Sequence, residues 1–167
     1  ADAKAAVKVL IEKDYHTAKK YAKVLSERNH ERKELDSDIT RDAIDMVQNS
    51  PRLMNKYSMV LQGEGWSKGV IGIVASRMVE QFYKPTIVFS LNDGMLTGSA
   101  RSIKTFDIHE AIGACGELVE QFGGHKYAAG LSIKVENFDA FADKFESIVR
   151  QTITDEDLIP VVEYDLE

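Results

Sequence analysis

The sequence predicts an α/β fold: a mixed sheet with flanking helices, preceded by one long helix. Two observations support this prediction. Residues 14–50 read as a single helix. From residue 57 onward, short β-rich runs alternate with helical patterns, and a hairpin turn joins two of the runs. The hairpin fixes one antiparallel strand pair within the sheet.

The first region expected is a helical connector, with helices at 2–12 and 14–50, Asp14 as the cap between them and Pro51 as the stop. The middle of the long helix, SERNHERKE (26–34), is polar on every face. Such a helix is typical of a bridge between two bodies, and it would reach about 55 Å. A helix that lies on one domain or pairs as a coiled coil is the alternative.

The strands expected in the sheet are 57–61, 86–91, 95–102 and 128–135. The turn Asn92-Asp93-Gly94 is a strong hairpin signal between the second and third of them. The helices expected around the sheet are 70–82, 107–122 and 138–151. A further strand is expected to begin within 159–167 and to belong to another domain. The expected division is a connector at 1–52, an α/β domain at 53–154 and the start of a following domain at 155–167.

The composition fits a globular chain of 167 residues, 44% of them apolar. No apolar run approaches the roughly 20 residues that a bilayer span requires, so we expect a cytoplasmic protein without membrane contact. The single cysteine, Cys115, excludes an internal disulfide and is expected to be buried. Charge is uneven: residues 50–104 carry seven bases against three acids, and residues 136–167 carry two against ten. The net charge of −6 therefore neither supports nor excludes nucleic-acid binding.

The segment GSARS (98–102) has the composition of an anion clamp. Strand alternation puts Ser99 and Arg101 on one face, and Ser102 with small residues on the other. The forked guanidinium of arginine suits the geometry of a phosphate, and hydroxyl groups add donors. An exposed strand with an ordinary surface arginine is the alternative.

The segment Gly123-Gly124-His125 is expected as a loop directly after a helix end. Adjacent glycines let the backbone approach a ligand closely, and an imidazole can donate to a phosphate or a base. A helix cap with a structural histidine is the alternative.

A third glycine-rich segment, GWSKG (65–69), opens the helix expected at 70–82. Its free backbone amides could bind an anion, and Trp66 could stack on a base, although a packing role for the tryptophan is the alternative. No cluster of His, Asp and Glu has the spacing of a metal site. We therefore expect no catalytic residue and no metal ligand in this chain.

These segments bear a family resemblance. GWSKGVIGIVASRMVEQFYKPTIVFS (65–90), GSARS, FDIHEAI (106–112) and FGGHKYAAG (122–130) resemble successive motifs of the DHHA1 domain of RecJ-family single-stranded-DNA-specific exonucleases, in the DHH phosphoesterase superfamily. Residues 25–44 resemble the connector between the family's DHH and DHHA1 domains. The resemblance implies a fragment of an exonuclease that degrades single-stranded DNA from the 5′ end in repair and recombination.

The resemblance also implies roles for individual residues. Ser99, Arg101 and Ser102 would contact the DNA backbone or its 5′ end. Gly123, Gly124 and His125 would line the cleft opposite the metals. The metals, Mn or Mg, belong to a DHH domain whose motifs are absent here, and an OB-like domain would follow. We therefore expect single-stranded DNA and those two domains as partners, a monomer, and no hydrolysis by this chain alone.

Two other functions fit the same residues. One is the DHHA1 module of a phosphoesterase that acts on small molecules or short oligonucleotides. The other is a non-enzymatic RNA-binding appendage, like the related domain of alanyl-tRNA synthetases.

Overall fold

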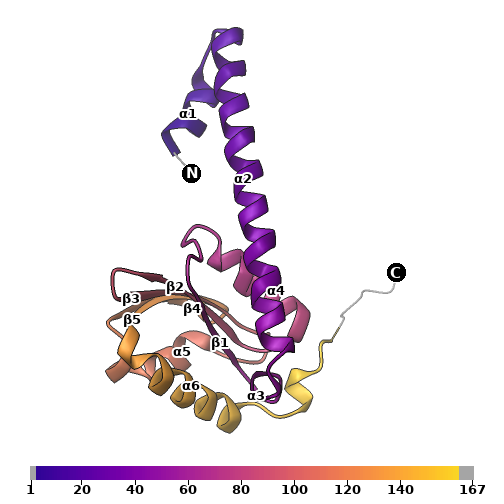
Figure 1. The fold of residues 1–167 in the computed structure, drawn as a ribbon, viewed down its shortest axis with the longest axis vertical. Coiled ribbons are helices and arrows are strands. Elements are labelled where there is room, and N and C mark those ends of the chain that lie inside the picture. Colours follow the sequence, from indigo (N-terminus) through magenta and orange to yellow (C-terminus); the bar gives the residue numbers. More distant parts are fainter. Residues whose placement is uncertain (1–2, 162–167) are drawn as a thin grey trace.

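The computed structural model describes residues 3–161, in which a five-stranded sheet carries helices on both faces and one long helix rises away from it (Figure 1). The strand order is β1-β2-β3-β5-β4. Strand β1 runs parallel to β2, and the other neighbours pair antiparallel, so the predicted mixed sheet is confirmed. The strands are β1 (Met59–Gly63), β2 (Thr86–Asn92), β3 (Met95–Arg101), β4 (Gln121–His125) and β5 (Ala128–Lys134).

The long helix α2 (Tyr15–Gln48) follows α1 (Ala3–Ile11), which folds back beside its first turns. Between them Asp14 caps α2 as predicted, because its carboxylate accepts a hydrogen bond from the backbone N–H of Thr17 at 2.7 Å. Hydrogen bonding to the side chain and then to the backbone of Thr17 lowers the pKa of Asp14. At 34 residues α2 is about 51 Å long. Its polar middle is exposed, as the sequence predicts for a helix that is polar on every face.

The last turns of α2 pack on the domain through Ile39, Ala43 and Val47, which lie against α4 (Ile71–Phe82). An ion pair joins the same two helices where α2 leaves the domain: the carboxylate of Asp36 lies 2.8 Å from the guanidinium of Arg77. Asp36 is only 4% exposed. A buried charge without a partner is costly, so this pair favours one placement of α2 on α4.

After α2, Pro51 begins a further short helix, α3 (Pro51–Met54), with Ser50 as its cap. Where the chain then enters the sheet, it is hydrogen-bonded to Glu146, a buried carboxylate on α6 (Phe138–Thr152). Glu146 accepts hydrogen bonds from the backbone N–H groups of Tyr57 and Ser58, at 3.0 and 2.9 Å, and from the Ser58 hydroxyl at 2.6 Å. These bonds explain why β1 begins at Met59 and not at residue 57, where the predicted strand 57–61 starts.

The two faces of the sheet are covered unequally. Helices α5 (Ile108–Gly113) and α6 lie on one face, where Phe89, Phe141 and Phe145 pack with their rings about 6 Å apart. On the opposite face α4 packs over β2 and β3, and its apolar side chains share a core cluster with Met59 and Leu61 of β1. Beyond the contact of α4 with β3, the part of this face formed by β5 and β4 carries no helix from residues 3–161 (Figure 1).

The hairpin predicted at Asn92-Asp93-Gly94 is confirmed. Asp93 and Gly94 both have positive φ, 49° and 77°, as the two central residues of a type I′ turn require. The helices predicted at 70–82 and 138–151 and the strand predicted at 128–135 are also confirmed, within one residue at each end.

One predicted helix, 107–122, is wrong in its second half. Asp107 does cap α5, because its side chain accepts from the backbone N–H of Glu110. The helix ends at Gly113, a short 3₁₀ turn follows at Gly116–Leu118, and the chain enters β4. Glycines disfavour the helix, and hydrogen bonding to β5 outweighs the local helical pattern.

The strand predicted within 159–167 falls mostly outside the described residues, and 159–161 form no strand. Between residues 3 and 161, no helix combines the length and apolarity that crossing a bilayer requires.

The adjacent glycines of β4 allow a test of the strand assignment. An ideal Cβ on Gly124 would lie 2.5 Å from the Cα of Ala129, and Gly124 has φ 150°, whereas a Cβ on Gly123 meets nothing within 4 Å. We expect Gly124→Ala to lower the free energy of unfolding by about 2–4 kcal/mol, and Gly123→Ala by less than about 1 kcal/mol. Urea unfolding measures both. Equal losses would show that the β4–β5 pairing is not the one described.

Candidate functional site

The open part of the sheet presents three rows of side chains, each crossing β3, β5 and β4 in register. We call these nine residues the open face: Thr97, Ser132 and Gln121 in the first row, Ser99, Gly130 and Gly123 in the second, and Arg101, Ala128 and His125 in the third. All nine are small, polar or basic. The middle row contains two glycines, so its floor beyond β3 is bare backbone.

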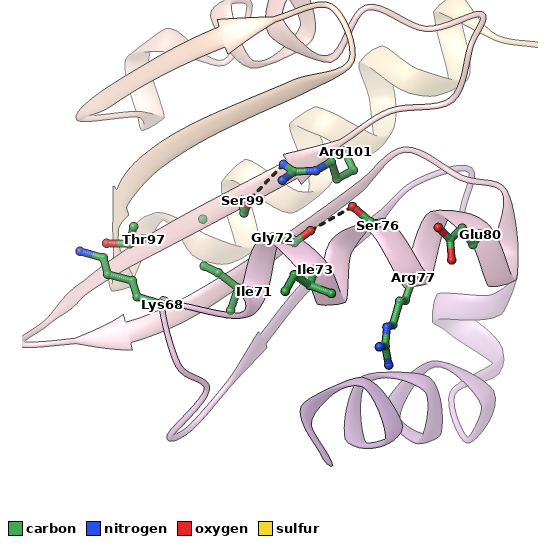
Figure 2. Close-up of a pocket in the computed structure, with 12 residues that line it drawn as sticks. Lys68, Ile71, Gly72, Ile73, Ser76, Arg77, Glu80, Thr97, Ser99 and Arg101 are labelled. Carbon is green, nitrogen blue, oxygen red and sulfur yellow. Dashed lines mark hydrogen bonds between the residues drawn. The ribbon is translucent and has the colours of Figure 1, made fainter. Parts of the chain in front are cut away.

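Two hollows lie over this face and share part of their lining, Lys68, Thr97 and Gly98. The first, of about 790 Å³, lies between α4 and β3 (Figure 2). The second, of about 400 Å³, continues over β5 and β4. Together the two hollows form one groove.

Arg101 and Ser99 lie together in the first hollow, on one face of β3 as strand alternation predicts (Figure 2). The Nη1 of Arg101 donates to the Ser99 hydroxyl at 3.1 Å and to the Ala100 carbonyl at 2.8 Å. Within residues 3–161 no carboxylate forms an ion pair with Arg101. Its side chain is therefore oriented by neutral acceptors, and its charge is not neutralised.

Gly72, on the first turn of α4, makes room for this arrangement. An ideal Cβ on Gly72 would lie 3.0 Å from Nη2 of Arg101 and 3.1 Å from the Ser99 hydroxyl oxygen. Sequence reasoning missed this residue. The available signal was a glycine inside an otherwise apolar helix, which costs helix stability and so indicates a close neighbour.

Ser102, the third predicted residue of this segment, does not join the other two. Its hydroxyl donates to the Phe106 carbonyl at 2.8 Å, and its backbone N–H donates to the Tyr127 carbonyl. Ser102 lines neither hollow. Its hydrogen bonds hold the turn after β3 against the β4–β5 hairpin.

The Gly123-Gly124-His125 segment is an edge strand, so the predicted loop after a helix end is wrong. Gly123 and His125 lie on the open face, whereas Gly124 packs against Ala129 on the other face. His125 is exposed, and its Nδ1 accepts from the backbone N–H of Tyr127 at 3.3 Å. It shares a row with Arg101 two strands away, about 10 Å across the sheet.

The segment before α4 differs from its prediction in two respects. Trp66 is only 6% exposed and its ring covers Gly63, so it packs and offers no face to a base. Three backbone amides at the start of the helix are already bonded, because those of Val70 and Ile71 donate to the Ser67 carbonyl and that of Gly69 to the Ser67 hydroxyl. Lys68 instead extends its ammonium group along the groove (Figure 2).

Cys115 and His109 do not line the groove. Cys115 is buried, and burial raises the pKa of its thiol to about 11. The ring of His109 packs on Phe122 with centroids 5.2 Å apart. In the described part of the chain, no three His, Cys, Asp or Glu residues cluster closely enough to hold a metal ion. The groove is therefore lined with hydrogen-bond donors and cations, which suit an anion.

Comparisons with known proteins match both the domain and the helix before it. The family model described as "DHHA1 domain" matches residues 55–151. The single-stranded-DNA-specific exonuclease RecJ of Bacillus subtilis is 37% identical over 163 residues, which cover 96% of this chain and 20% of that protein. The chain thus spans about a fifth of the length of that relative.

Solved structures give the same match. RecJ of Thermus thermophilus in complex with Mg²⁺ superposes with a TM-score of 0.80 at 28% identity, over 90% of this chain and 23% of that one. The same enzyme with Mn²⁺ also gives 0.80. The C-Ala domain of Aquifex aeolicus alanyl-tRNA synthetase superposes with a TM-score of 0.50 at 13% identity, over 55% of this chain and 89% of that domain. That last likeness shows a shared fold alone.

Gly72→Ala should separate binding from stability. The added methyl group displaces the end of the flexible Arg101 side chain, whereas alanine favours the helix by up to about 1 kcal/mol. We expect an unchanged or slightly higher free energy of unfolding, together with about threefold or greater loss of affinity for a 5′-phosphorylated single-stranded oligonucleotide. Urea unfolding and fluorescence anisotropy measure the two quantities. Gly116→Ala, at an open position outside the groove, is the control, and full affinity in Gly72→Ala would argue against the Arg101 geometry.

Proposed function

The chain belongs to the DHHA1 domain family, and from that premise we propose that it binds and positions single-stranded DNA for a RecJ-type exonuclease that works from the 5′ end. One observation supports this most directly. Arg101, held by Ser99 and a backbone carbonyl, offers an unpaired guanidinium above an open face with a glycine floor. A guanidinium in such a position suits a phosphate oxygen of the strand.

The glycine floor supports a ligand that approaches the backbone closely. Neither Gly123 nor Gly130 has positive φ. An ideal Cβ would meet nothing within 4 Å at Gly123, and at Gly130 only one carbonyl oxygen at 3.9 Å. Neither conformation nor packing requires glycine at these two positions. We infer that their lack of side chains serves the ligand, which can then lie flat on the sheet.

In this proposal the chain supplies orientation and charge neutralisation, and another part of the protein supplies bond cleavage. Mn²⁺ or Mg²⁺ held by a DHH domain would activate the water that attacks the phosphodiester. Ser99 and Arg101 would hold a phosphate of the strand, with Gly123 and His125 across the face from them. Ser102 and Gly124 would support this surface from behind.

We propose the same division of the chain as above, with a connector at 1–52, the DHHA1 domain at 53–154 and the start of an OB-like domain at 155–167. The connector would place the groove opposite the metal domain, in a monomeric cytoplasmic protein of DNA repair and recombination. The identity to RecJ over nearly the whole chain, connector included, supports this assignment over an RNA-binding appendage or a small-molecule phosphoesterase. Binding assays with single-stranded DNA, tRNA and a dinucleotide distinguish the three functions.

Arg101→Ala should weaken DNA binding in a salt-dependent manner. Loss of one phosphate contact is expected to lower affinity for a single-stranded oligonucleotide about tenfold, and to reduce the slope of log K against log salt by about 0.7. Fluorescence anisotropy titrations at several salt concentrations measure both quantities. Arg52→Ala, which removes the same charge from α3 outside the groove, is the control. An unchanged affinity and slope in Arg101→Ala would contradict the proposed contact.

The chain alone should not hydrolyse DNA. No described cluster of side chains can hold the metals, so we expect no release of nucleotides from labelled single-stranded DNA in manganese buffer. The matched preparation of Arg101→Ala controls for contaminating nucleases. Hydrolysis by the wild-type chain that Arg101→Ala abolishes would belong to this chain and would refute the division of labour.

A further inference from the structure

The groove contains a second cation that the proposed function has not used. Lys68 lies just before α4 and lines both hollows, together with Thr97 and Gly98. Figure 2 shows Lys68 and Thr97 at one end of the first hollow, Ser99 and Arg101 farther along it, and Glu80 toward the other end. Lys68 is exposed, and it makes no ion pair with any carboxylate of residues 3–161. Its ammonium group is therefore available to a ligand.

The two cations lie at different places along the first hollow (Figure 2). Thr97, beside Lys68, and Arg101 lie on the same strand four residues apart, which corresponds to about 13 Å. A phosphate held between Arg101 and Ser99 and a phosphate held beside Thr97 would therefore occupy separate places along the strand. If both cations act on one ligand, that ligand must carry phosphates along its length, as a polynucleotide does.

The charges in the groove also set the direction in which such a ligand extends. Toward the C-terminal end of α4 the first hollow is lined by Glu80, and the cation there, Arg77, is paired with Asp36 on α2. The second hollow, beyond Lys68, has no Asp or Glu in its described lining. A backbone bound at Arg101 therefore meets repulsion along α4 and attraction toward Lys68.

The row of the open face nearest Lys68 adds neutral donors. Thr97, Ser132 and Gln121 stand side by side across β3, β5 and β4, and all three line the second hollow. Two hydroxyls and an amide can donate to phosphate oxygens without fixing a sequence. This row has the composition of a backbone contact surface.

We propose that Lys68, with Thr97 and Ser132, forms a second phosphate subsite, so that a single strand runs from Arg101 along β3 toward the β2–β3 hairpin. This inference rests on the proposed function, because it assumes that the groove binds a nucleic-acid backbone. It adds the path of the strand and the minimum length of ligand that uses the whole groove. A mononucleotide occupies the Arg101 subsite alone, and a longer strand occupies both.

Ligand length tests this path. NMR titrations, which measure weak affinities, would compare thymidine 5′-monophosphate with 5′-phosphorylated oligothymidylates of two and six nucleotides. We expect Lys68→Ala to bind the hexanucleotide about fivefold more weakly and the mononucleotide within about twofold of the wild-type chain. Lys68→Arg should restore the hexanucleotide affinity. Arg101→Ala should weaken all three ligands.

Lys144→Ala provides a matched loss of charge, because Lys144 lies on α6 behind the sheet, where it pairs with Glu117. Circular dichroism during urea unfolding shows whether each variant is folded. Equal weakening of mononucleotide and hexanucleotide in Lys68→Ala, or no weakening of either, would overturn the second subsite while leaving the Arg101 contact intact. No binding by the wild-type chain, or no effect of Arg101→Ala on any ligand, would instead refute the proposed function.

Discussion

The packing of α4 on one side of the sheet is the constraint on which the rest of the structure depends. This helix lies over β2 and β3, and it buries Val74, Ala75 and Met78 in one cluster with apolar residues of β1 and β2. Because no other helix lies on that face in the described chain, the rows stay open over β5 and β4, next to the contact of α4 with β3. If a second helix packed there, we would expect apolar side chains in place of Ser99, Gly130 and Gly123, because a sheet face covered by a helix is apolar. The open face exists because the layer above it is incomplete.

The same helix links the groove to the long helix. On one side Gly72 lets α4 approach Arg101 and Ser99, and on the other Arg77 holds the buried carboxylate of Asp36 on α2. One rigid element thus shapes the anion-binding surface and carries the ion pair that orients the connector. The Glu146 hydrogen bonds fix Tyr57 and Ser58, a few residues after the connector, to α6, so the chain that leaves α2 is also held on the domain.

Sequence reasoning succeeded where local chemistry decides the structure. The positive φ required at Asp93 and Gly94 fixes the hairpin, and alternation along β3 then places Ser99 beside Arg101. The prediction was wrong at β4. All five residues of this strand, QFGGH, are exposed, so its sequence does not show the alternation of apolar and polar residues that marks a half-buried strand. Only pairing with β5 makes this segment a strand. The close approach of Gly72 to Ser99 and Arg101 could not be predicted either, because those two residues lie on β3, far from Gly72 in the sequence.

The length and rigidity of α2 give the Asp36 anchor a mechanical meaning. From Asp36 to the first turn, at Tyr15, the helix extends about 32 Å. A tilt of about 5° at the anchor therefore displaces the far end by about 3 Å, the length of one hydrogen bond. Whatever the first turns of α2 contact is therefore positioned, relative to Arg101, by the Asp36–Arg77 ion pair and the packing of Ile39, Ala43 and Val47 at the other end of the helix.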